Sequence, residues 1–377
     1  MPISPNESKY LRVAAQIETE LRSGAWDGGR MPSVRGIATQ HKVSVVTASR
    51  ALQVLRDKGL IQTIERSGCY RIPPPTADRW AVCLRLTPSA LHRQTISVVQ
   101  SGFQALARRM PMHLAFDAFD VRPGLTPDEA KAAARQAIDD GIRGVFLLPS
   151  RVSEEEAKAD EAFLLGCDAA ALPVVLMERN VRGRTMLSHD LVAIDDVAAA
   201  RECTEHLFAI GRKRVGIVVA SPVSSHDDRV AGYLFAVNDA KQTTFAGKPP
   251  PVDVVIRQPT DLPSREAYSA VADEAIRHNL DGLICYQDYT AIGVIFEMIQ
   301  RRVRVPEDLA VIGFDNLPLG QEFGITLSSY DYPGEAMADC GVKLMMDRIA
   351  QSTRPPVKVH IPGKLIVRES TRTAAVY

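Results

Sequence analysis

Cysteine and histidine are few in this sequence, and neither is clustered. The cysteines form no CxxC pair, and the eight histidines show no spacing typical of metal ligands. These absences argue against a zinc site and against a disulfide framework, and most of the cysteines lie in apolar runs, as buried thiols do. The sequence therefore predicts a protein of a reducing compartment without a bound metal. The cysteines are residues 69, 83, 167, 203, 285 and 340.

Motifs of catalysis and of membrane insertion are also absent. The chain contains no GxxxxGKS/T phosphate loop, no GxSxG nucleophile elbow and no HExxH metalloprotease motif. No apolar run approaches the roughly 20 residues of a membrane helix, and the first residues, MPISPNESKY, lack the parts of a signal peptide. We therefore expect a cytoplasmic protein with no enzymatic activity and no cofactor.

Net charge is zero, but the charge is unevenly distributed. The chain has 45 basic and 45 acidic residues, whereas residues 1–72 alone have 11 basic and 6 acidic side chains, a net charge of +5. The remainder therefore carries −5. A small basic domain joined to a mildly acidic one is consistent with a polyanionic partner for the first domain only.

The stretch Met31–Tyr70 has the pattern of a helix-turn-helix followed by a two-stranded wing. Ser33 and Ser44 stand where N-caps are expected, before two short helical runs. In the second run, apolar side chains recur at helical spacing and leave the opposite face for bases and phosphates. The apolar positions are Ala48, Ala51, Leu52 and Leu55, and the outer positions include Val45, Val46, Thr47, Ser49, Arg50 and Gln53.

After residue 79, apolar strands alternate with helices, which predicts an α/β fold of parallel sheets flanked by helices. Nearly 300 residues of this pattern suggest two lobes. We expect a DNA-binding domain over residues 1–72, a proline-rich linker over 73–79 and a sensor over 80–377. The predicted strands are 80–86, 113–118, 144–148, 173–177, 215–219, 252–256, 282–285 and 309–312.

The first domain resembles the winged helix-turn-helix of GntR-family regulators. MPSVR, VSVVTASRAL and LRDKGLI carry the resemblance, which covers nearly all of residues 8–72. It implies that the Arg after Pro-Ser, the start of the recognition helix and the wing tip contact operator DNA. The family often has Arg where Val45 and Ser49 stand and Gly where Arg66 stands, so the operator should differ from those of relatives. The DNA-contacting residues expected from the pattern and the resemblance are Arg35, Ser44, Val45, Thr47, Ser49, Arg50, Arg66, Ser67 and Gly68.

The sensor resembles LacI/GalR-type sensor domains, whose fold is that of periplasmic sugar-binding proteins. The motifs appear in order over about residues 80–371: IDD, GRKRVG, RVAGY, DGLICYQD, VPEDLAVIGFDN and LIVRES. The resemblance implies two lobes joined by three crossings, near 193–195, 327–329 and 352. The first lobe would comprise about 80–193 and 328–352, and the second about 195–327 and 353–377.

In such a fold the ligand lies between the lobes at the carboxyl ends of the strands. Arg229 and Asp288 are the first candidates, because a guanidinium fork and a carboxylate together can hold vicinal hydroxyls. Glu178, Asp315 and His92 are further candidates, each with an ordinary structural role as the alternative. Tyr233 and Phe314 could stack on a sugar face or simply be core aromatics.

Taken together, these patterns predict a DNA-binding transcription regulator, a repressor associated with the nucleoid, whose operator binding depends on an effector. The resemblance to arabinose-responsive repressors favours a sugar, and a homodimer binding two half-sites is expected. A purine or another metabolite as effector, and a transport-type sugar-binding protein, remain the alternatives.

Overall fold

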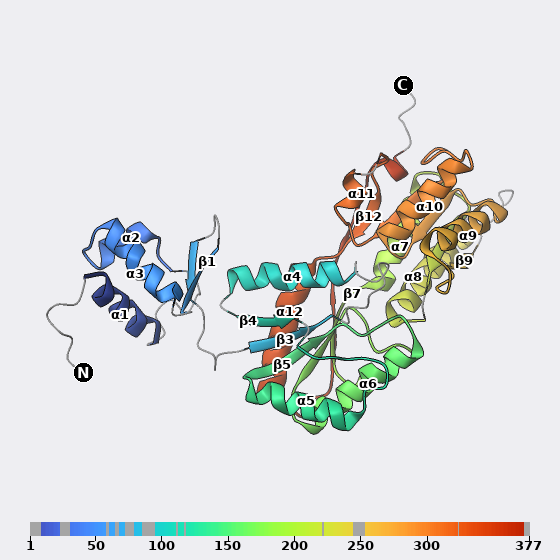
Figure 1. The fold of residues 1–377 in the computed structure, drawn as a ribbon. Helices are drawn as coiled ribbons and strands as arrows, with labels where there is room; N and C mark the ends of the chain where they lie inside the picture. Colours follow the sequence, from blue (N-terminus) through green and yellow to red (C-terminus); the bar gives the residue numbers. More distant parts are fainter. Residues whose placement is uncertain are drawn as a thin grey trace.

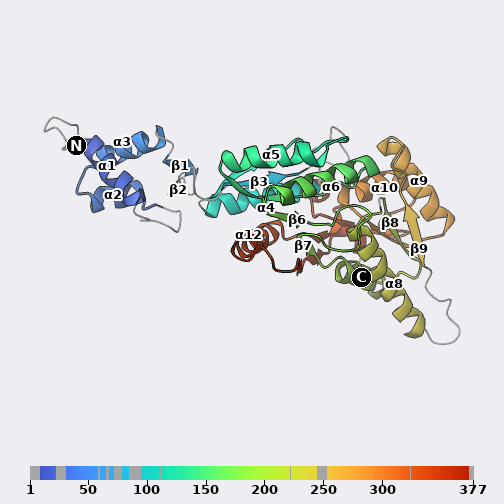
Figure 2. The same cartoon turned by 90° about the horizontal axis from the view of Figure 1, so that it is seen from below.

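The computed structural model shows a small N-terminal head followed by a two-lobed sensor (Figure 1, Figure 2). No helix in the described part of the chain is both long and apolar enough to span a bilayer. The structure describes residues 9–22, 31–57, 60–64, 68–71, 79–84, 95–110, 112–116, 118–220, 222–243, 253–322 and 324–372.

The head is a three-helix unit with a short antiparallel ribbon. Its core contains Ile17, Ile37, Leu52 and Leu55, all nearly inaccessible to solvent, so the predicted apolar face of the second run is confirmed. Both predicted caps are also present: Ser33 Oγ accepts from the Gly36 amide, and Ser44 Oγ accepts from the Thr47 amide. The elements are α1 Lys9–Arg22, α2 Val34–Gln40, α3 Val45–Asp57, β1 Ile61–Ile64 and β2 Gly68–Arg71.

The first lobe is a six-stranded parallel sheet covered by helices on both faces. Its strand order is β13-β7-β6-β5-β3-β4, and every neighbouring pair is parallel. The strand β5 has no exposed residue except Arg143, as expected for a sheet covered on both sides. The elements are β3 Arg79–Cys83, α4 Thr95–Arg109, β4 His113–Phe116, α5 Pro127–Asp139, β5 Ile142–Leu147, α6 Glu154–Ala169, β6 Val174–Met177, β7 Asp190–Ile194, α12 Gly334–Ala350 and β13 Lys358–Ile361.

The second lobe repeats this architecture, with strand order β14-β12-β11-β10-β8-β9. All of its pairs are parallel except the edge pair between β12 and β14. The predicted two-lobed α/β sensor is therefore confirmed. The elements are α7 Asp196–Ala209, β8 Val215–Val219, α8 Ser224–Thr243, β9 Val254–Arg257, α9 Ser264–Arg277, β10 Gly282–Cys285, α10 Asp288–Gln300, β11 Ala310–Phe314, α11 Leu319–Glu322, β12 Ser328–Asp331, β14 Lys364–Ile366 and the 3-10 turn Glu369–Thr371.

The chain crosses between the lobes three times, and two crossings lie later than predicted. The first follows β7, as expected. The second follows β12, because β12 pairs with β11 of the second lobe instead of joining the first. The third lies between β13 and β14, since β13 pairs with β7 and β14 pairs with β12. Residue 79, expected in the linker, is the first residue of β3.

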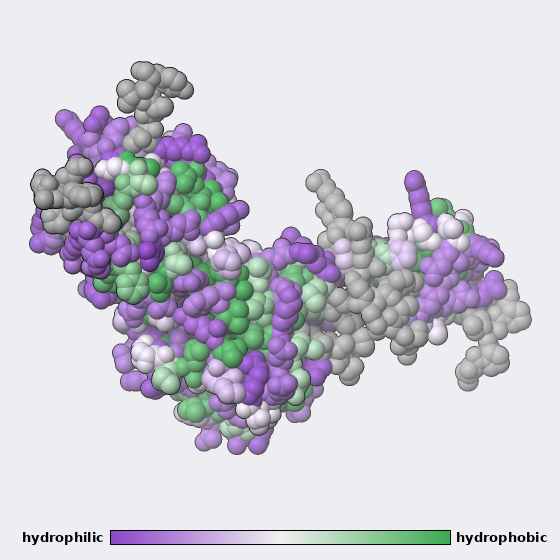
Figure 3. Space-filling model, turned by 180° about the vertical axis from the view of Figure 1, so that it is seen from behind, coloured by the Kyte–Doolittle hydropathy of each residue, from purple (hydrophilic) through white to green (hydrophobic). Residues whose placement is uncertain are grey.

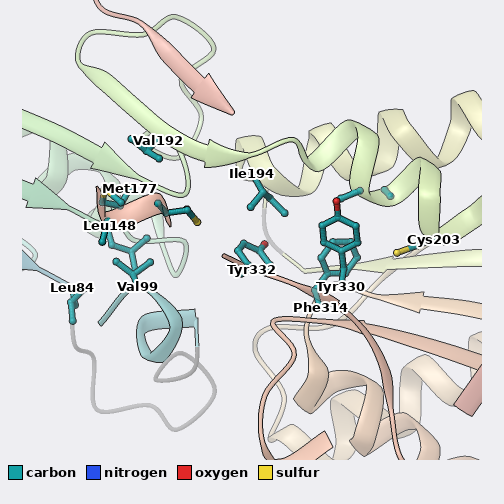
Figure 4. Close-up of a cluster of buried hydrophobic side chains, with 14 of the residues drawn as sticks. Leu84, Val99, Leu148, Met177, Val192, Ile194, Cys203, Phe314, Tyr330 and Tyr332 are labelled. Atoms are coloured by element: carbon teal, nitrogen blue, oxygen red, sulfur yellow. The ribbon is translucent and has the colours of Figure 1, made fainter. Parts of the chain in front are cut away.

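A continuous hydrophobic cluster passes through these crossings. Figure 4 shows Ile194 and Tyr332 between a first-lobe group that includes Leu148 and Met177 and a second-lobe group that includes Phe314. Ile194 ends β7 and Tyr332 follows β12, so two of the three crossing segments contribute to the packing. A rotation of one lobe against the other must therefore repack these side chains.

Glycine allows the closest helix contact of the second lobe. A Cβ placed on Gly232 of α8 would lie 2.0 Å from the Val197 carbonyl oxygen of α7, a distance that no side chain tolerates. The Gly232 position in the RVAGY motif thus brings α8 against the N-terminal turn of α7. That approach matters for the site described below, because Arg229 lies one turn before Gly232.

A buried carboxylate joins the last part of the sensor to the first lobe. Asp190, fully buried at the start of β7, accepts hydrogen bonds from the guanidinium groups of Arg348 and Arg354 and from the Val357 amide. Burial by itself raises the pKa of Asp190, but the two guanidinium groups and the amide outweigh it, so the pKa lies below the usual range. The carboxylate thereby fixes the end of α12 and the strand β13 to the first sheet.

We expect Asp190→Asn to lower the free energy of unfolding of the sensor by about 3 kcal/mol at pH 7, because two guanidinium groups lose their shared countercharge. Since the native pKa is depressed, this stabilisation is present above about pH 4 and is lost as the pH falls below that value. Urea unfolding at pH 7 and at pH 3.5 measures both effects. The exposed pair of Asp120 and Arg122 provides the control, and Asp120→Asn should cost less than about 1 kcal/mol. Equal losses in the two variants would contradict the assignment.

Candidate functional site

The N-terminal end of α3 presents an exposed surface on the head. Val45 and Val46 are 49% and 65% exposed, and they are the exposed large apolar side chains in the described part of the head. Ser49 and Arg50 are exposed on the same helix, and Thr47 is half-buried beside the Ser44 cap. Figure 3 shows that the described head residues are largely hydrophilic on that view of the molecule.

The remaining residues of the predicted DNA surface lie on α2, at the start of β2 or outside the described residues. Arg35 is exposed in the first turn of α2. Gly68 begins β2 with φ of 122°, a conformation that favours glycine. Arg66 and Ser67 fall outside the described residues, so the wing contact stays a prediction.

Between the lobes, buried charged and amide side chains converge from the carboxyl ends of neighbouring strands. Arg151 follows β5, Glu178 and Arg179 follow β6, Gln287 follows β10, and Asp315 follows β11. Together with Arg229, these residues form what we call the interlobe cluster. All six are less than 10% exposed. Parallel strands bring their carboxyl ends to one edge of a sheet, which is where α/β proteins bind ligands.

Hydrogen bonds within and near this cluster bridge the two lobes. Arg151 Nη2 of the first lobe donates to Gln287 Oε1 of the second lobe over 2.8 Å, and its guanidinium carbon lies 5.6 Å from the centre of the Tyr286 ring. The Asn180 amide donates to Ser224 Oγ over 3.1 Å. The cluster therefore links the two lobes to each other.

Arg229 connects the cluster to two of the crossing segments. Its Nε donates to Asp196 Oδ1 over 2.7 Å, directly after the first crossing, and its Nη2 donates to the Tyr332 hydroxyl at the second crossing. Nη1 donates to the Tyr286 carbonyl oxygen, and the guanidinium carbon lies 4.0 Å from the Phe314 ring centre. Because each of its three nitrogens already donates to the protein, Arg229 holds the hinge as well as facing the cluster.

Asp288, predicted as a ligand residue, has both carboxylate oxygens bonded within the second lobe. Oδ1 accepts from Ser329 Oγ over 2.6 Å, and Oδ2 accepts from the Leu317 amide over 2.7 Å. Burial, and then the nearby charge of Asp315, raise the pKa of Asp288. These contacts give Asp288 the role of fixing the loop after β11, and they do not support the predicted contact with ligand hydroxyls. The adjacent Gln287 lies in the cluster instead.

Glu178 and Asp315 adopt backbone conformations with positive φ, which residues other than glycine rarely adopt. Their φ angles are 68° and 97°, and residues other than glycine in such conformations cost on the order of 1–3 kcal/mol each. Glu178 Oε2 accepts a hydrogen bond from Arg179. Asp315 is 5% exposed, and its Oδ2 has no hydrogen-bond partner among the described residues. Burial raises the pKa of Asp315 to about 7, against the opposing charges of Arg229, Arg151 and Arg179.

Of the remaining candidates, two are buried aromatic residues of the second lobe and one lies outside the described residues. Tyr233 is a core residue, whose hydroxyl donates to the Val215 carbonyl oxygen and accepts from the Val254 amide. Phe314 lies beneath the Arg229 guanidinium. His92 falls outside the described residues. Sequence reasoning missed Arg151, Arg179, Gln287 and Tyr332, although the first two follow apolar strand runs, the same signal that identified Glu178.

Two family profiles match the chain, one for each part of the structure. Residues 9–70 match the bacterial regulatory proteins of the gntR family, and residues 204–371 match the periplasmic binding protein-like domain. The two matches agree with the head and with most of the second lobe and the returning segments.

Curated relatives of nearly full length are named as transcriptional regulators. A ribose operon repressor of Halalkalibacterium halodurans is 24% identical over 91% of this chain and 98% of its own length. An arabinose metabolism transcriptional repressor of the same organism is 21% identical and covers 98% of both chains. Both are named as repressors, in agreement with the regulator expected from the sequence.

Solved structures show the same fold. The complex of the transcriptional regulator CelR with cellobiose has a TM-score of 0.60 at 19% identity, covering 97% of this chain and 100% of that chain. A LacI family transcriptional regulator from Enterococcus faecium with bound ribose has a TM-score of 0.58 at 17% identity, covering 78% of this chain and 98% of that chain.

We expect Asp315→Asn to stabilise the protein at pH 8. The folded chain holds the Asp315 proton up to a pKa of about 7, so ionisation costs stability as the pH rises from about 4 to 7. Asparagine has no charge to desolvate and tolerates positive φ better than most residues. The midpoint of thermal unfolding should exceed that of the parent by about 2 °C at pH 8, and the two should converge near pH 4.

Thermal unfolding of both proteins between pH 4 and pH 8 measures this difference. The exposed Asp261→Asn variant serves as the control, and its midpoint should follow the parent at every pH. A variant at position 315 that is less stable than the parent at pH 8 would show that the Asp315 carboxylate stabilises the free protein.

Proposed function

Because the chain joins a gntR-family helix-turn-helix head to a periplasmic binding protein-like sensor, we propose that it is a transcription regulator controlled by a small-molecule effector. The effector is a sugar or a sugar derivative that binds at the interlobe cluster. One observation carries the proposal: buried hydrogen-bonding side chains from both lobes meet at the carboxyl ends of the strands, on a chain with a DNA-binding head. Two structural relatives contain a bound sugar, cellobiose in one and ribose in the other, which supports this effector class.

Operator DNA is the partner that we assign to the head. The exposed end of α3 enters the major groove, where Val45 and Val46 contact thymine methyl groups, and Arg35 and Arg50 contact phosphates or bases. Ser44 and Thr47 stand at the amino end of the helix, where backbone amides favour a phosphate. The protein acts in the cytoplasm as a homodimer, so that two heads contact two half-sites.

Effector binding acts through the hinge. A ligand that contacts Asp315 and Gln287 of the second lobe together with Arg151 of the first favours one lobe arrangement over the other. Arg229 transmits this preference to Asp196 and Tyr332, the residues at two crossing segments. The change in lobe angle alters the spacing of the two heads and releases the operator. Coupling of this kind amounts to about 1–3 kcal/mol in regulators.

Fluorescence anisotropy with DNA from the upstream region of the protein's own gene tests the proposal. We expect specific binding at moderate salt and release on addition of one member of a panel of pentoses, hexoses, sugar acids, sugar phosphates and purines. A shuffled DNA of the same composition is the control, and its affinity should be lower by a factor of about 10³ or more. Absence of specific DNA binding would contradict the regulator, and a purine as the active compound would contradict the sugar.

We expect Arg35→Ala to weaken operator binding by about 1–3 kcal/mol, because an arginine contact to base or phosphate is lost. Arg12 is also exposed, on α1 of the same head, and Arg12→Ala should change operator affinity by less than about twofold. Anisotropy titrations of both variants, with effector affinity measured by calorimetry, separate the head from the sensor. Equal losses in the two variants would indicate that the contact surface lies elsewhere.

A further inference from the structure

Arg151 differs from the other buried arginines of the interlobe cluster because it has no carboxylate partner in the described part of the chain. Arg229 is paired with Asp196, and Arg179 is paired with Glu178. The Arg151 guanidinium, in a side chain only 7% exposed, donates to the neutral amide of Gln287 and faces the ring of Tyr286. Within the described residues, no carboxylate lies within 4.0 Å of it. A guanidinium buried against neutral partners is an uncompensated positive charge.

A second cation strengthens this positive charge. Arg179 follows the neighbouring strand, and its Nε has no hydrogen-bond partner among the described residues. Burial lowers the pKa of Arg151, and the charge of Arg179 lowers it further. Asp315 is close enough to act on both guanidinium groups, but it forms no ion pair with either, and its own pKa of about 7 leaves it partly protonated near neutral pH. The first-lobe side of the cluster is therefore short of negative charge.

The second-lobe side has the complementary chemistry. Asp315 Oδ2 is buried without a hydrogen-bond partner among the residues that the structure describes, and the side-chain oxygen of Gln287 accepts from Arg151. A carboxylate oxygen accepts hydroxyl protons, and an amide both donates and accepts. The two sides of the cluster thus suit the two ends of one molecule, an anionic group and a set of hydroxyls.

We propose that the effector is an anionic sugar derivative, whose negatively charged group is bound by Arg151 and Arg179 and whose hydroxyls are bound by Asp315 and Gln287. The anion takes the place of the Gln287 oxygen on Arg151, which frees that oxygen to accept from a hydroxyl, while the Gln287 nitrogen stays directed at Tyr286 and Thr290. The charged group is a carboxylate, as in a uronic or aldonic acid, or a phosphate ester, since both offer oxygens to a guanidinium fork. This inference rests on the proposed effector site and specifies its ligand class.

Isothermal titration calorimetry with matched pairs of probes tests the charge requirement. The pairs are glucuronate with glucose, galacturonate with galactose, arabinonate with arabinose, and ribose 5-phosphate with ribose, all at constant ionic strength. We expect at least one anionic probe to bind about tenfold or more tightly than its neutral partner, the gain expected of a hydrogen bond to a charged group. Preference for an acid or for the phosphate identifies the source of the negative charge.

Three variants connect the preference to Arg151. Arg151→Gln should reduce the ratio of anionic to neutral affinity to within about threefold of unity, whereas Arg151→Lys, which keeps the charge, should retain most of it. Arg184→Gln is the control, because that arginine is exposed in the same lobe and paired with Glu161. It should leave the ratio unchanged. Thermal unfolding of each variant checks that it is folded.

The outcomes separate this inference from the proposed function. A neutral sugar that binds as tightly as its acid and releases operator DNA would overturn the anionic effector and leave the regulator intact. An Arg151→Gln variant that keeps the full ratio of anionic to neutral affinity would likewise overturn the anionic effector and leave the regulator intact. Failure of every probe to bind overturns the anionic effector as stated. Failure to bind the upstream DNA contradicts the regulator itself, and anisotropy reports it independently of the calorimetry.

Discussion

The buried ion pair between Arg229 and Asp196 is the interaction on which the sensor's geometry depends. Asp196 stands directly after the first crossing, and the same guanidinium donates to Tyr332 at the second. Removing one member of such a pair leaves an uncompensated buried charge, at a cost of about 3–5 kcal/mol. The pair forms only because Gly232 lets α8 lie against α7. One glycine and one arginine in the same motif thus join helix packing, hinge and effector site.

The segments that cross between the lobes are close-packed, so the angle between the lobes cannot change gradually. The Tyr332 ring packs in the hydrophobic cluster that passes between the lobes (Figure 4), and its hydroxyl accepts a hydrogen bond from Arg229. Close-packed side chains move between discrete arrangements and not along a continuum. Under the proposed function, a small shift at Arg151 or Asp315 would favour one packed arrangement of the lobes over another, which is the two-state element that effector control requires.

Features whose signals are local could be predicted from the sequence. The lobe to which a strand belongs could not, because strand pairing is decided by residues far apart in the chain. The caps Ser33 and Ser44 and the apolar face of α3 depend on neighbours within four residues, and they are confirmed. The short strands β12 and β13 stand just before the second and third crossings, and their lobes are decided by pairing with strands distant in the sequence, so the predicted lobe boundaries are wrong at these two strands. Spacing does not show which of two adjacent residues faces the partner lobe: the sequence predicts Asp288 as a ligand residue, whereas in the structure Gln287 contacts Arg151 of the first lobe and Asp288 bonds within the second.

In the proposed regulator, the sensor would control the position of the head and not its internal packing. In the described part of the chain, the head's hydrophobic cluster, which includes Ile17 and Leu55, contains no residue of the sensor. Altered lobe packing therefore has no direct route into the core of the head. In the proposed homodimer, the sensor would change the position of the start of β3 in each subunit, and hence the distance between the two heads. Because half-site spacing is a strict geometric requirement, a small change in that distance is enough to weaken binding.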